Sequence, residues 1–272
     1  MDSNRVQGKL LIIGGAEDKD GECVILKRLI ALAGGNQARV LIVTTATEEP
    51  RDVGREYKEI FRELGAEQAE VLDIRDRRAA GREDCLEHLE KAGAIFFTGG
   101  DQLRITSLLG GTPLDRAVRK AYASGAVIAG TSAGASAMSE TMIVGGDSGE
   151  APRQDTLRLA PGLGLLAGVV IDQHFAQRGR MGRLLVAVAQ NPGILGVGVD
   201  EDTALEVSPA GEFRVIGSQT VTIIDGRDIG ETNISEVATD ENLAMTGVKL
   251  HVLPAGYGYS LPNHRPLWKE NS

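Results

Sequence analysis

Short apolar runs alternate with amphipathic segments along the first half of the chain, and this alternation constrains the fold most. The runs Leu10–Ile13 and Val40–Val43 are apolar at every position, as a parallel strand covered on both faces requires. The segments Glu22–Leu32 and Arg51–Leu64 carry apolar residues at helical spacing. The expected strands are Lys9–Ile13, Arg39–Thr44, Glu70–Ile74, Ala94–Thr98 and Ala126–Ala129. This rhythm predicts an α/β fold, a mostly parallel sheet covered by helices on both faces.

Beyond residue 195 the pattern changes to short strand-like pieces broken by turn residues. These pieces are Thr203–Val207, Phe213–Ile216 and Thr220–Ile224, and they are typical of antiparallel hairpins. We therefore expect an antiparallel β extension at one side of the parallel sheet. No linker rich in Pro, Gly or Ser marks a domain boundary, so residues 1–272 are predicted to form a single domain.

The composition is that of an ordinary folded domain, with 42% hydrophobic and 25% charged residues. No apolar run approaches the roughly 18 residues of a membrane span, so no membrane partner is expected. Met1–Arg5 leads within a few residues into the first expected strand, which leaves no room for a secretory signal. The sequence thus predicts a cytoplasmic protein.

The charge and the cysteines argue against several classes of partner. A net charge of −9 and an aromatic content of 4% disfavour nucleic-acid binding, which draws on clustered Lys and Arg and on stacking rings. Cys23 and Cys85 lie far apart in the sequence without metal-binding spacing, so neither a disulfide nor a metal site is expected. No phosphate-binding glycine motif of standard spacing is present. We expect no cofactor.

The main chemical signal is Gly130–Gly134 (GTSAG), which follows the expected strand Ala126–Ala129 and precedes a segment of small residues. This is the pattern of a nucleophile elbow, a sharp turn between strand and helix that exposes a serine hydroxyl at the sheet edge. Ser132 is the candidate nucleophile. The alternative interpretation is that Ser132 merely caps the following helix, since serine is a preferred N-cap residue.

A second glycine pair, Gly99-Gly100, follows the expected strand Ala94–Thr98. Because the carboxyl ends of parallel strands meet at one sheet edge, this pair is expected near Ser132. Acyl transfer requires N–H donors for the oxyanion, and we predict those of Gly100 and Ala133. The alternative is a simple turn.

A serine nucleophile requires a base, and the chain has four histidines. His88 lies in a charged helical segment, His251 in an alternating strand and His264 in a polar tail. His174 closely follows the apolar strand Gly168–Ile171. Its place at a strand end makes His174 the candidate general base.

The base in turn requires a carboxylate that fixes its tautomer. Glu201 is the first choice because it follows the strand Gly196–Val199 within an acidic triplet, Asp200–Asp202. Asp147 and Asp172 are the competitors, and the local sequence does not decide between the three. An acidic triplet is also typical of a solvated turn, in which Asp200 and Asp202 have no role.

Long polar side chains are dense around His174. They are Gln173, Gln177, Arg178, Arg180 and Arg183, just before the apolar helix Leu184–Ala189. Positive charge near a helix N-terminus opposes the helix dipole, which suggests a carboxylate partner such as a substrate. The alternative is a solvated helix end.

Four motifs in order resemble those of the cyanophycinase family: Gly14–Lys19 (GGAEDK), Phe97–Gln102 (FTGGDQ), Gly130–Ala135 (GTSAGA) and Asp172–Phe175 (DQHF). The resemblance spans nearly the whole chain. It implies a class I glutamine amidotransferase-like fold and a serine exopeptidase related to the aspartyl dipeptidases. The implied substrate is cyanophycin, a poly-aspartate with arginine on each side-chain carboxyl, and the implied product is β-aspartyl-arginine.

Carried over by position, the resemblance implies Ser132 as nucleophile, His174 as base and Glu201 as orienting acid. Further polar family positions are implied to bind the substrate, with Asp172 suited to a cationic group and the arginines to carboxylates: Gln102, Asp172, Gln173, Arg178, Arg180 and Arg183. The resemblance also implies a homodimer. A dipeptidase, another serine acyl hydrolase or a non-catalytic binding protein of the same fold remain as alternatives. Related glutamine amidotransferases use a cysteine nucleophile and a His-x-Glu pair. Here the nucleophile is Ser132 and the residue two positions after His174 is Ala176, so an amidotransferase is disfavoured.

Overall fold

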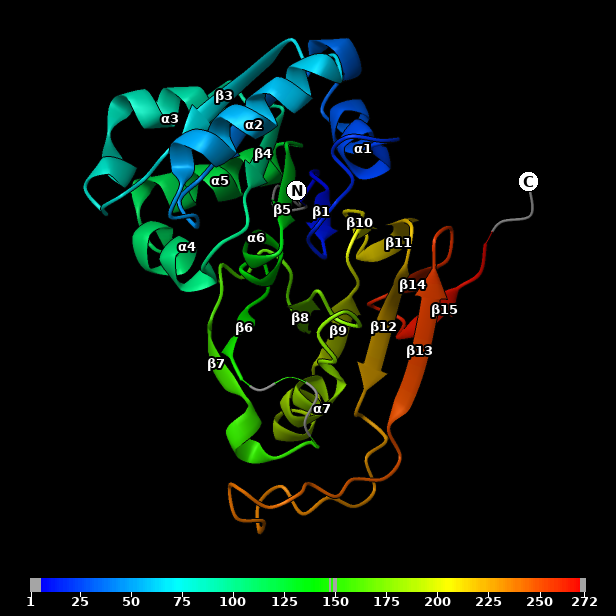
Figure 1. Cartoon of the computed structure of the whole chain (residues 1–272). Coiled ribbons are helices and arrows are strands. Elements are labelled where there is room, and N and C mark those ends of the chain that lie inside the picture. The colour runs from blue at the N-terminus through cyan, green and yellow to red at the C-terminus, as the bar shows by residue number, and fades with distance from the viewer. Residues whose placement is uncertain (1–5, 147, 149–150, 270–272) are drawn as a thin grey trace, which may run out of the picture.

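A computed structural model describes residues 6–146, 148 and 151–269, and its largest element is a nine-stranded mixed sheet (Figure 1). Five parallel strands, β1, β5, β4, β2 and β3, form one side, and the antiparallel strands β10, β11, β14 and β15 extend it beyond β1. The predicted α/β fold with an antiparallel extension is confirmed. In spatial order the strands are β15 (Arg265–Leu267), β14 (Gly258–Ser260), β11 (Glu212–Gly217), β10 (Thr203–Val207), β1 (Leu10–Ile13), β5 (Val127–Thr131), β4 (Ala94–Phe97), β2 (Arg39–Val43) and β3 (Gln68–Leu72).

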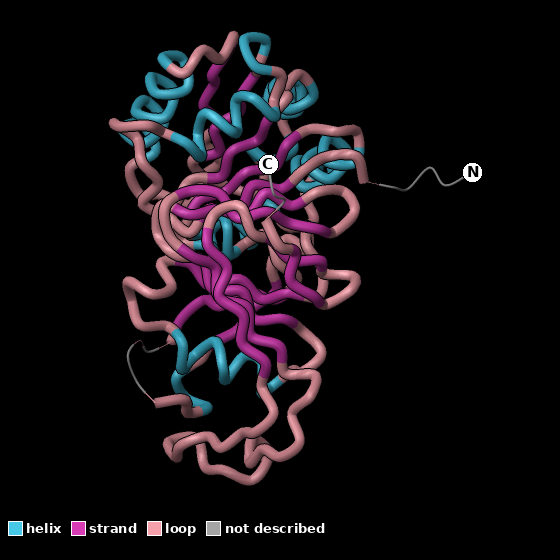
Figure 2. The backbone as a smooth tube through the Cα atoms, turned by 90° about the vertical axis from the view of Figure 1, so that its right-hand side faces the viewer, coloured by secondary structure: helices cyan, strands magenta, loops and turns pink. Residues whose placement is uncertain are grey.

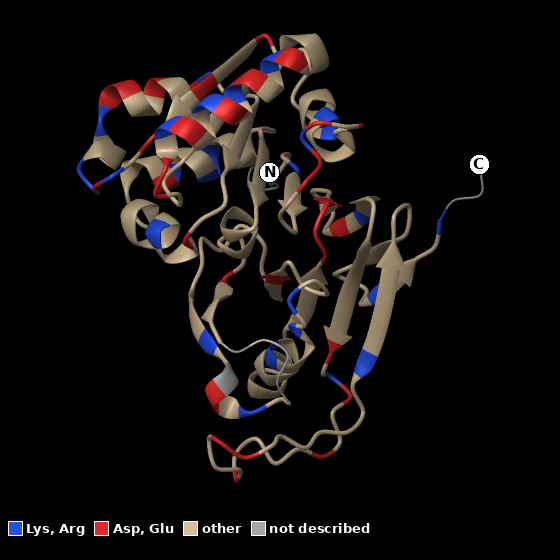
Figure 3. Cartoon of the chain, viewed as in Figure 1, with Lys and Arg blue, Asp and Glu red and all other residues tan. Residues whose placement is uncertain are grey.

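Helices cover both faces of this sheet, as the apolar strands require. On β1, Leu11 and Ile13 pack into the cluster that contains the first two helices, whereas Leu10 and Ile12 pack into the cluster on the other face. The first face carries α1 (Val24–Leu32) and α2 (Pro50–Glu63). The second face carries α3 (Glu83–Glu90), α4 (Gln102–Leu109), α5 (Pro113–Ala123) and α6 (Ala133–Ser136). Figure 3 shows acidic and basic residues interspersed along α2.

A second, four-stranded sheet was not anticipated. Its order is β13 (Lys249–Pro254), β12 (Thr220–Asp225), β9 (Leu195–Val199) and β8 (Val169–Gln173). We expected the strand at 220–224 to extend the main sheet, but β12 pairs with β9, with Val221 opposite Val199. The physical reason is packing. Ile223 enters the core shared with the main sheet, while Ile224 packs in the cluster around α7 (Met181–Gln190).

The part of the molecule farthest from α2 and α3 contains α7, a hairpin and a long connection (Figures 1 and 2). The hairpin is formed by β6 (Thr141–Gly145) and β7 (Arg158–Pro161), and the connection runs over residues 226–248 between β12 and β13. Short 3-10 turns occur at Gly35–Gln37, Ala79–Gly81 and Gln154–Thr156. In the described ranges, no helix combines the length and the apolar character that crossing a bilayer requires.

The two sheets meet at the carboxyl ends of their strands, and this junction positions the site. The N–H of Ser132, after β5, donates to Ile13 O of β1 at 3.0 Å. The N–H of His174, after β8, donates to Gly14 O at 2.8 Å. Backbone hydrogen bonds therefore bring the candidate nucleophile and the candidate base to the same end of β1.

Candidate active site

Ser132 lies in a strained turn between β5 and α6, with φ 53° and ψ −108°. A Cβ added to Gly130 would lie 2.5 Å from the carbonyl carbon of Gly134, and one added to Gly134 would lie 2.4 Å from Phe97 O. Both positions therefore require glycine, as a nucleophile elbow does. The Ser132 side chain makes no capping hydrogen bond to α6, so helix capping does not explain the serine.

His174 holds its imidazole against the Ser132 hydroxyl, with 3.0 Å between Nε2 and Oγ. Its backbone is also in the left-handed region, at φ 47°. Burial lowers the pKa of His174 below its ordinary value of 6.5, the hydrogen bond to Glu201 raises it in part, and the nearby Arg178 charge lowers it further. The lowered pKa favours the neutral ring, which is the form that accepts a proton.

Glu201 completes the chain of contacts, since its Oε1 lies 2.6 Å from His174 Nδ1. Its backbone N–H donates to Gln177 Oε1 at 3.1 Å, which holds the acid in place. Asp172, one competitor for this role, is engaged instead with Arg183 and Arg180. The other competitor, Asp147, lies outside the described residues.

The neighbours of Glu201 in the acidic triplet anchor two loops, whereas the sequence was also compatible with a solvated turn in which they have no role. Asp200 is buried and accepts a hydrogen bond from the N–H of Ala176 at 3.0 Å and from the Thr220 hydroxyl at 2.7 Å. Asp202 accepts from the N–H of Asp18 at 2.9 Å. These contacts tie the His174 loop and the loop after β1 to the residues flanking Glu201.

Gly99 and Gly100 lie beside the nucleophile, as expected. A Cβ added to Gly99 would lie 3.9 Å from Ser132 Oγ, and Gly100 adopts φ 138° against Ala46 O. Within the described part of the chain, neither the Gly100 N–H nor the Ala133 N–H donates a hydrogen bond to the protein. Both donors are free for an incoming oxygen, which is compatible with the predicted oxyanion hole.

Asp172, Arg180 and Arg183 form a buried ionic cluster behind His174. Arg183 Nε donates to Asp172 Oδ2 at 2.6 Å, and Arg180 Nη1 lies 3.3 Å from Oδ1 of the same carboxylate. All three side chains are buried. We expected the arginines near the N-terminus of α7 to require a carboxylate partner. For Arg180 and Arg183 that partner is Asp172 of the same chain.

The remaining predicted substrate residues differ in exposure. Arg178 is exposed and forms no ion pair with any described residue. Arg180 is buried, its Nε has no hydrogen-bond partner among the described residues, and burial lowers its pKa to about 10. Gln173 Oε1 lies 3.4 Å from Ser132 Oγ, whereas Gln102 donates to Ile143 O of β6 at 2.6 Å. Contact between these residues and a substrate remains a prediction.

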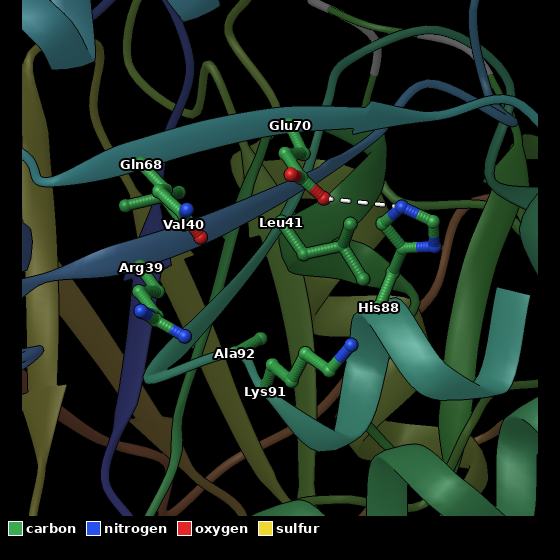
Figure 4. Close-up of a pocket in the computed structure, with 8 residues that line it drawn as sticks. All are labelled: Arg39, Val40, Leu41, Gln68, Glu70, His88, Lys91 and Ala92. Carbon is green, nitrogen blue, oxygen red and sulfur yellow. Dashed lines mark ion pairs between the residues drawn. The ribbon is translucent and has the colours of Figure 1, made fainter. Parts of the chain in front are cut away.

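A pocket of about 280 Å³ opens beside Ser132, between the loop after β1 and α2. Another pocket, of about 350 Å³, lies at the opposite edge of the sheet, around Arg39 and Gln68 at the starts of β2 and β3 (Figure 4). Its His88 and Glu70 pair with each other at 3.3 Å. Because ligands of α/β sheets bind at the carboxyl ends of the strands, the smaller pocket is the one relevant to chemistry.

No metal site is formed by the side chains that the structure describes. No three His, Cys, Asp or Glu residues in that part are placed to hold one ion. Cys23 and Cys85 are both buried free thiols.

Comparison with known proteins shows the family and supports the fold. The model of peptidase family S51 matches residues 10–214. A cyanophycinase from Geminocystis herdmanii is 44% identical over 263 residues, covering 96% of this chain and 97% of that protein. A cyanophycinase from Trichormus variabilis is 42% identical over 253 residues, covering 93% and 85%. The crystal structure of a peptidase from an acI-B1 Actinobacterium superposes with a TM-score of 0.69 at 23% identity, covering 95% and 98%, which supports the fold.

The fold and the site define a serine-type peptidase of the α/β class. The resemblance expected from the four motifs is confirmed. The chain belongs to peptidase family S51.

Proposed function

We propose that this chain hydrolyses cyanophycin from its end to β-aspartyl-arginine dipeptides, through a triad of Ser132, His174 and Glu201. The observation that carries the proposal is the unbroken chain of contacts from Ser132 Oγ to His174 Nε2 at 3.0 Å and from His174 Nδ1 to Glu201 at 2.6 Å. Relatives named cyanophycinase, more than 40% identical over most of both chains, support the substrate.

In the first step His174 Nε2 accepts the proton of the Ser132 hydroxyl while Oγ bonds to the carbonyl carbon of a backbone amide. The carbonyl oxygen becomes an oxyanion, which the N–H groups of Gly100 and Ala133 stabilise. One such preorganised donor contributes about 3 kcal/mol. Glu201 stabilises the imidazolium and keeps the Nδ1 proton in place.

The oxyanion then collapses, the amide C–N bond breaks, and His174 donates its proton to the leaving nitrogen. A water molecule loses a proton to His174 and attacks the Ser132 ester. Collapse of the second oxyanion releases the new carboxylate, and His174 returns the proton to Oγ. Every proton transfer passes through one imidazole, which therefore has to be neutral before each attack.

The substrate carboxylates are bound by arginine in this proposal. Arg178 is exposed and unpaired among the described residues, and Arg180 Nε is a buried donor without a partner. Arginine binds carboxylates through parallel N–H groups. Asp172 and Arg183 fix the position of Arg180 rather than contact the substrate, whereas Gln173, whose Oε1 lies 3.4 Å from Ser132 Oγ, is placed to contact it.

The proposal also includes a homodimeric, cytoplasmic protein of one domain that uses no metal or organic cofactor. Its catalytic steps involve only side chains and backbone groups of this chain. A chelator should accordingly leave the rate of hydrolysis unchanged.

The test is product analysis by mass spectrometry after incubation with purified cyanophycin. We expect β-aspartyl-arginine as the main soluble product, with its appearance blocked by a sulfonyl fluoride that sulfonylates the serine hydroxyl. Short aspartyl peptides without arginine branches serve as the comparison substrate. Release of free arginine alone, or cleavage of the short peptides with the polymer left intact, would contradict the proposed substrate and product.

A further inference from the structure

The pocket beside Ser132 has a buried acid among its lining residues. Glu17, from the loop after β1, lines it together with Tyr57 of α2 and Thr131, the residue before the nucleophile. Gly99 and Gly100 line the same pocket. A group bound there therefore lies next to both the nucleophile and the predicted oxyanion donors.

Glu17 is 4% exposed and accepts two hydrogen bonds from hydroxyl groups. The Tyr57 hydroxyl donates to Oε1 at 2.5 Å, and the Thr131 hydroxyl donates to Oε2 at 2.6 Å. Glu17 forms no ion pair with any described residue. A buried carboxylate without a cation is unfavourable unless a positive partner arrives, so this arrangement favours a cationic ligand.

The neighbours of Glu17 keep it an acceptor. Burial raises the pKa of Tyr57 well above its ordinary value, and the adjacent Glu17 raises it further, so the phenol stays protonated and donates. Lys19 forms no ion pair with Glu17. Its ammonium group lies 4.4 Å from the centre of the Tyr57 ring and pairs with Glu56 at 3.0 Å.

The ionic groups that line the pocket are two carboxylates and one ammonium, Glu17, Glu56 and Lys19, which gives a net charge of −1. The pocket volume of about 280 Å³ lies just below the roughly 300–1,000 Å³ typical of sites for whole small molecules. The size therefore suits a single side-chain group with one positive charge.

We propose that this pocket binds the guanidinium group of the arginine branch next to the scissile amide, with Glu17 as its charge partner and Glu56 at the mouth. The proposal rests on the proposed function for the identity of the substrate. Asp172, Arg178, Arg180 and Arg183 do not line the pocket. The enzyme thus separates two tasks: arginines near His174 bind substrate carboxylates, and Glu17 binds the substrate cation.

The test compares two synthetic poly-aspartyl peptides, one with β-linked arginine branches and one with β-linked citrulline branches. Citrulline has nearly the same shape but no charge. We expect the wild-type kcat/KM to be about 30-fold or more higher for the arginine peptide than for the citrulline peptide, because citrulline removes one partner of a buried charge pair. A wild-type enzyme that hydrolyses both peptides equally well contradicts the proposal.

The variant Glu17→Gln keeps the volume and the acceptor oxygen but removes the charge. We expect its preference for arginine branches to fall below about 3-fold, and that of Glu56→Gln to fall less because Glu56 is exposed. Glu59→Gln, an exposed position on α2 outside the pocket, is the matched control and should keep the wild-type preference. If Glu17 only positioned Thr131, both peptides would be hydrolysed more slowly and their ratio would not change.

Hydrolysis of neither peptide would overturn the proposed function. A second measurement then still tests whether the pocket binds a cation. A neutral sulfonyl fluoride sulfonylates the Ser132 hydroxyl with release of fluoride, and the rate is measured with ethylguanidinium or ethylurea present. We expect ethylguanidinium alone to slow sulfonylation of the wild type, with the protection lost in Glu17→Gln. Equal protection by both compounds, or none, would show that the pocket does not select a cation.

Discussion

The imidazole of His174 packs directly on Gly15, so that a Cβ added to the glycine would lie 2.4 Å from Cε1 of the ring. The preceding residue, Gly14, accepts the His174 N–H at 2.8 Å. From the sequence, the Gly14-Gly15 pair was compatible with a simple turn. In the structure it is the surface on which the base rests.

Gly15→Ala should therefore damage both stability and catalysis. The residue has φ 99°, and strain of this kind costs about 1–3 kcal/mol. Displacement of the imidazole by about 1 Å should lower kcat/KM by about 100-fold. Gly35→Ala is the control, because its φ is 65° with no atom within 4 Å, so it should lose stability but retain activity. Unfolding in urea and cyanophycin hydrolysis measure the two effects, and a Gly15→Ala enzyme with wild-type kcat/KM would contradict the account.

Glu201→Gln tests the orienting acid. The amide can present its N–H to Nδ1, which favours the wrong tautomer of His174, and we expect kcat to fall by about 100-fold to 10,000-fold with the fold retained. The hydrogen bond to Glu201 raises the pKa of His174, so its loss should lower that pKa. The acidic limb of the pH profile of the remaining activity should therefore move to lower pH. Glu212→Gln, exposed on β11, is the control. A loss of less than about 10-fold would assign the role elsewhere.

The pH dependence of kcat/KM should report His174 in the free enzyme. Only the neutral ring accepts the Ser132 proton, so activity should fall as the pH drops through a pKa below 6.5. The Arg178 charge lowers that pKa, and Arg178→Gln should therefore move the acid limb to higher pH. Arg116→Gln, on α5, should leave the limb in place. A shift to lower pH in Arg178→Gln would mean that the base is not His174.

Arg183→Met should destabilise the fold far more than Arg178→Met. Removing Arg183 leaves buried Asp172 with only the 3.3 Å contact to Arg180, and breaking a buried ion pair costs about 3–5 kcal/mol. Arg178 is exposed, and its replacement should change the free energy of unfolding by less than about 0.5 kcal/mol. Urea unfolding compares the two. Equal stabilities would show that the buried cluster contributes little to folding.

The three candidate residues could be selected from the sequence because each closely follows an apolar strand. His174 and Glu201 come after β8 and β9, adjacent parallel strands whose carboxyl ends share an edge. Ser132 comes after β5 of the other sheet, so its approach to His174 depends on how the two sheets meet. Local sequence indicated Ser132 because the flanking Gly130 and Gly134 permit the close approaches of a nucleophile elbow, and the missing capping hydrogen bond in the structure argues against the alternative of a helix cap.

Features that depend on contacts between distant residues were not predictable. The alternating pattern of β12 fits either sheet, and only packing against α7 and the shared core selects its partner β9. Asp172 carries no local sign of its pairing with Arg183, which lies in the first turn of α7. The burial of Glu17 follows from α2 and β5 closing around it, and no pattern near Glu17 indicates it.

The most direct test of the central claim is the rate of cyanophycin hydrolysis by Ser132→Ala, with folding verified by its urea unfolding curve. Ser107→Ala, an exposed serine on α4, is the matched control. We predict that Ser132→Ala loses at least about 10,000-fold in kcat while Ser107→Ala retains the wild-type rate. A folded Ser132→Ala enzyme that still hydrolyses cyanophycin at the wild-type rate would show that Ser132 is not the nucleophile.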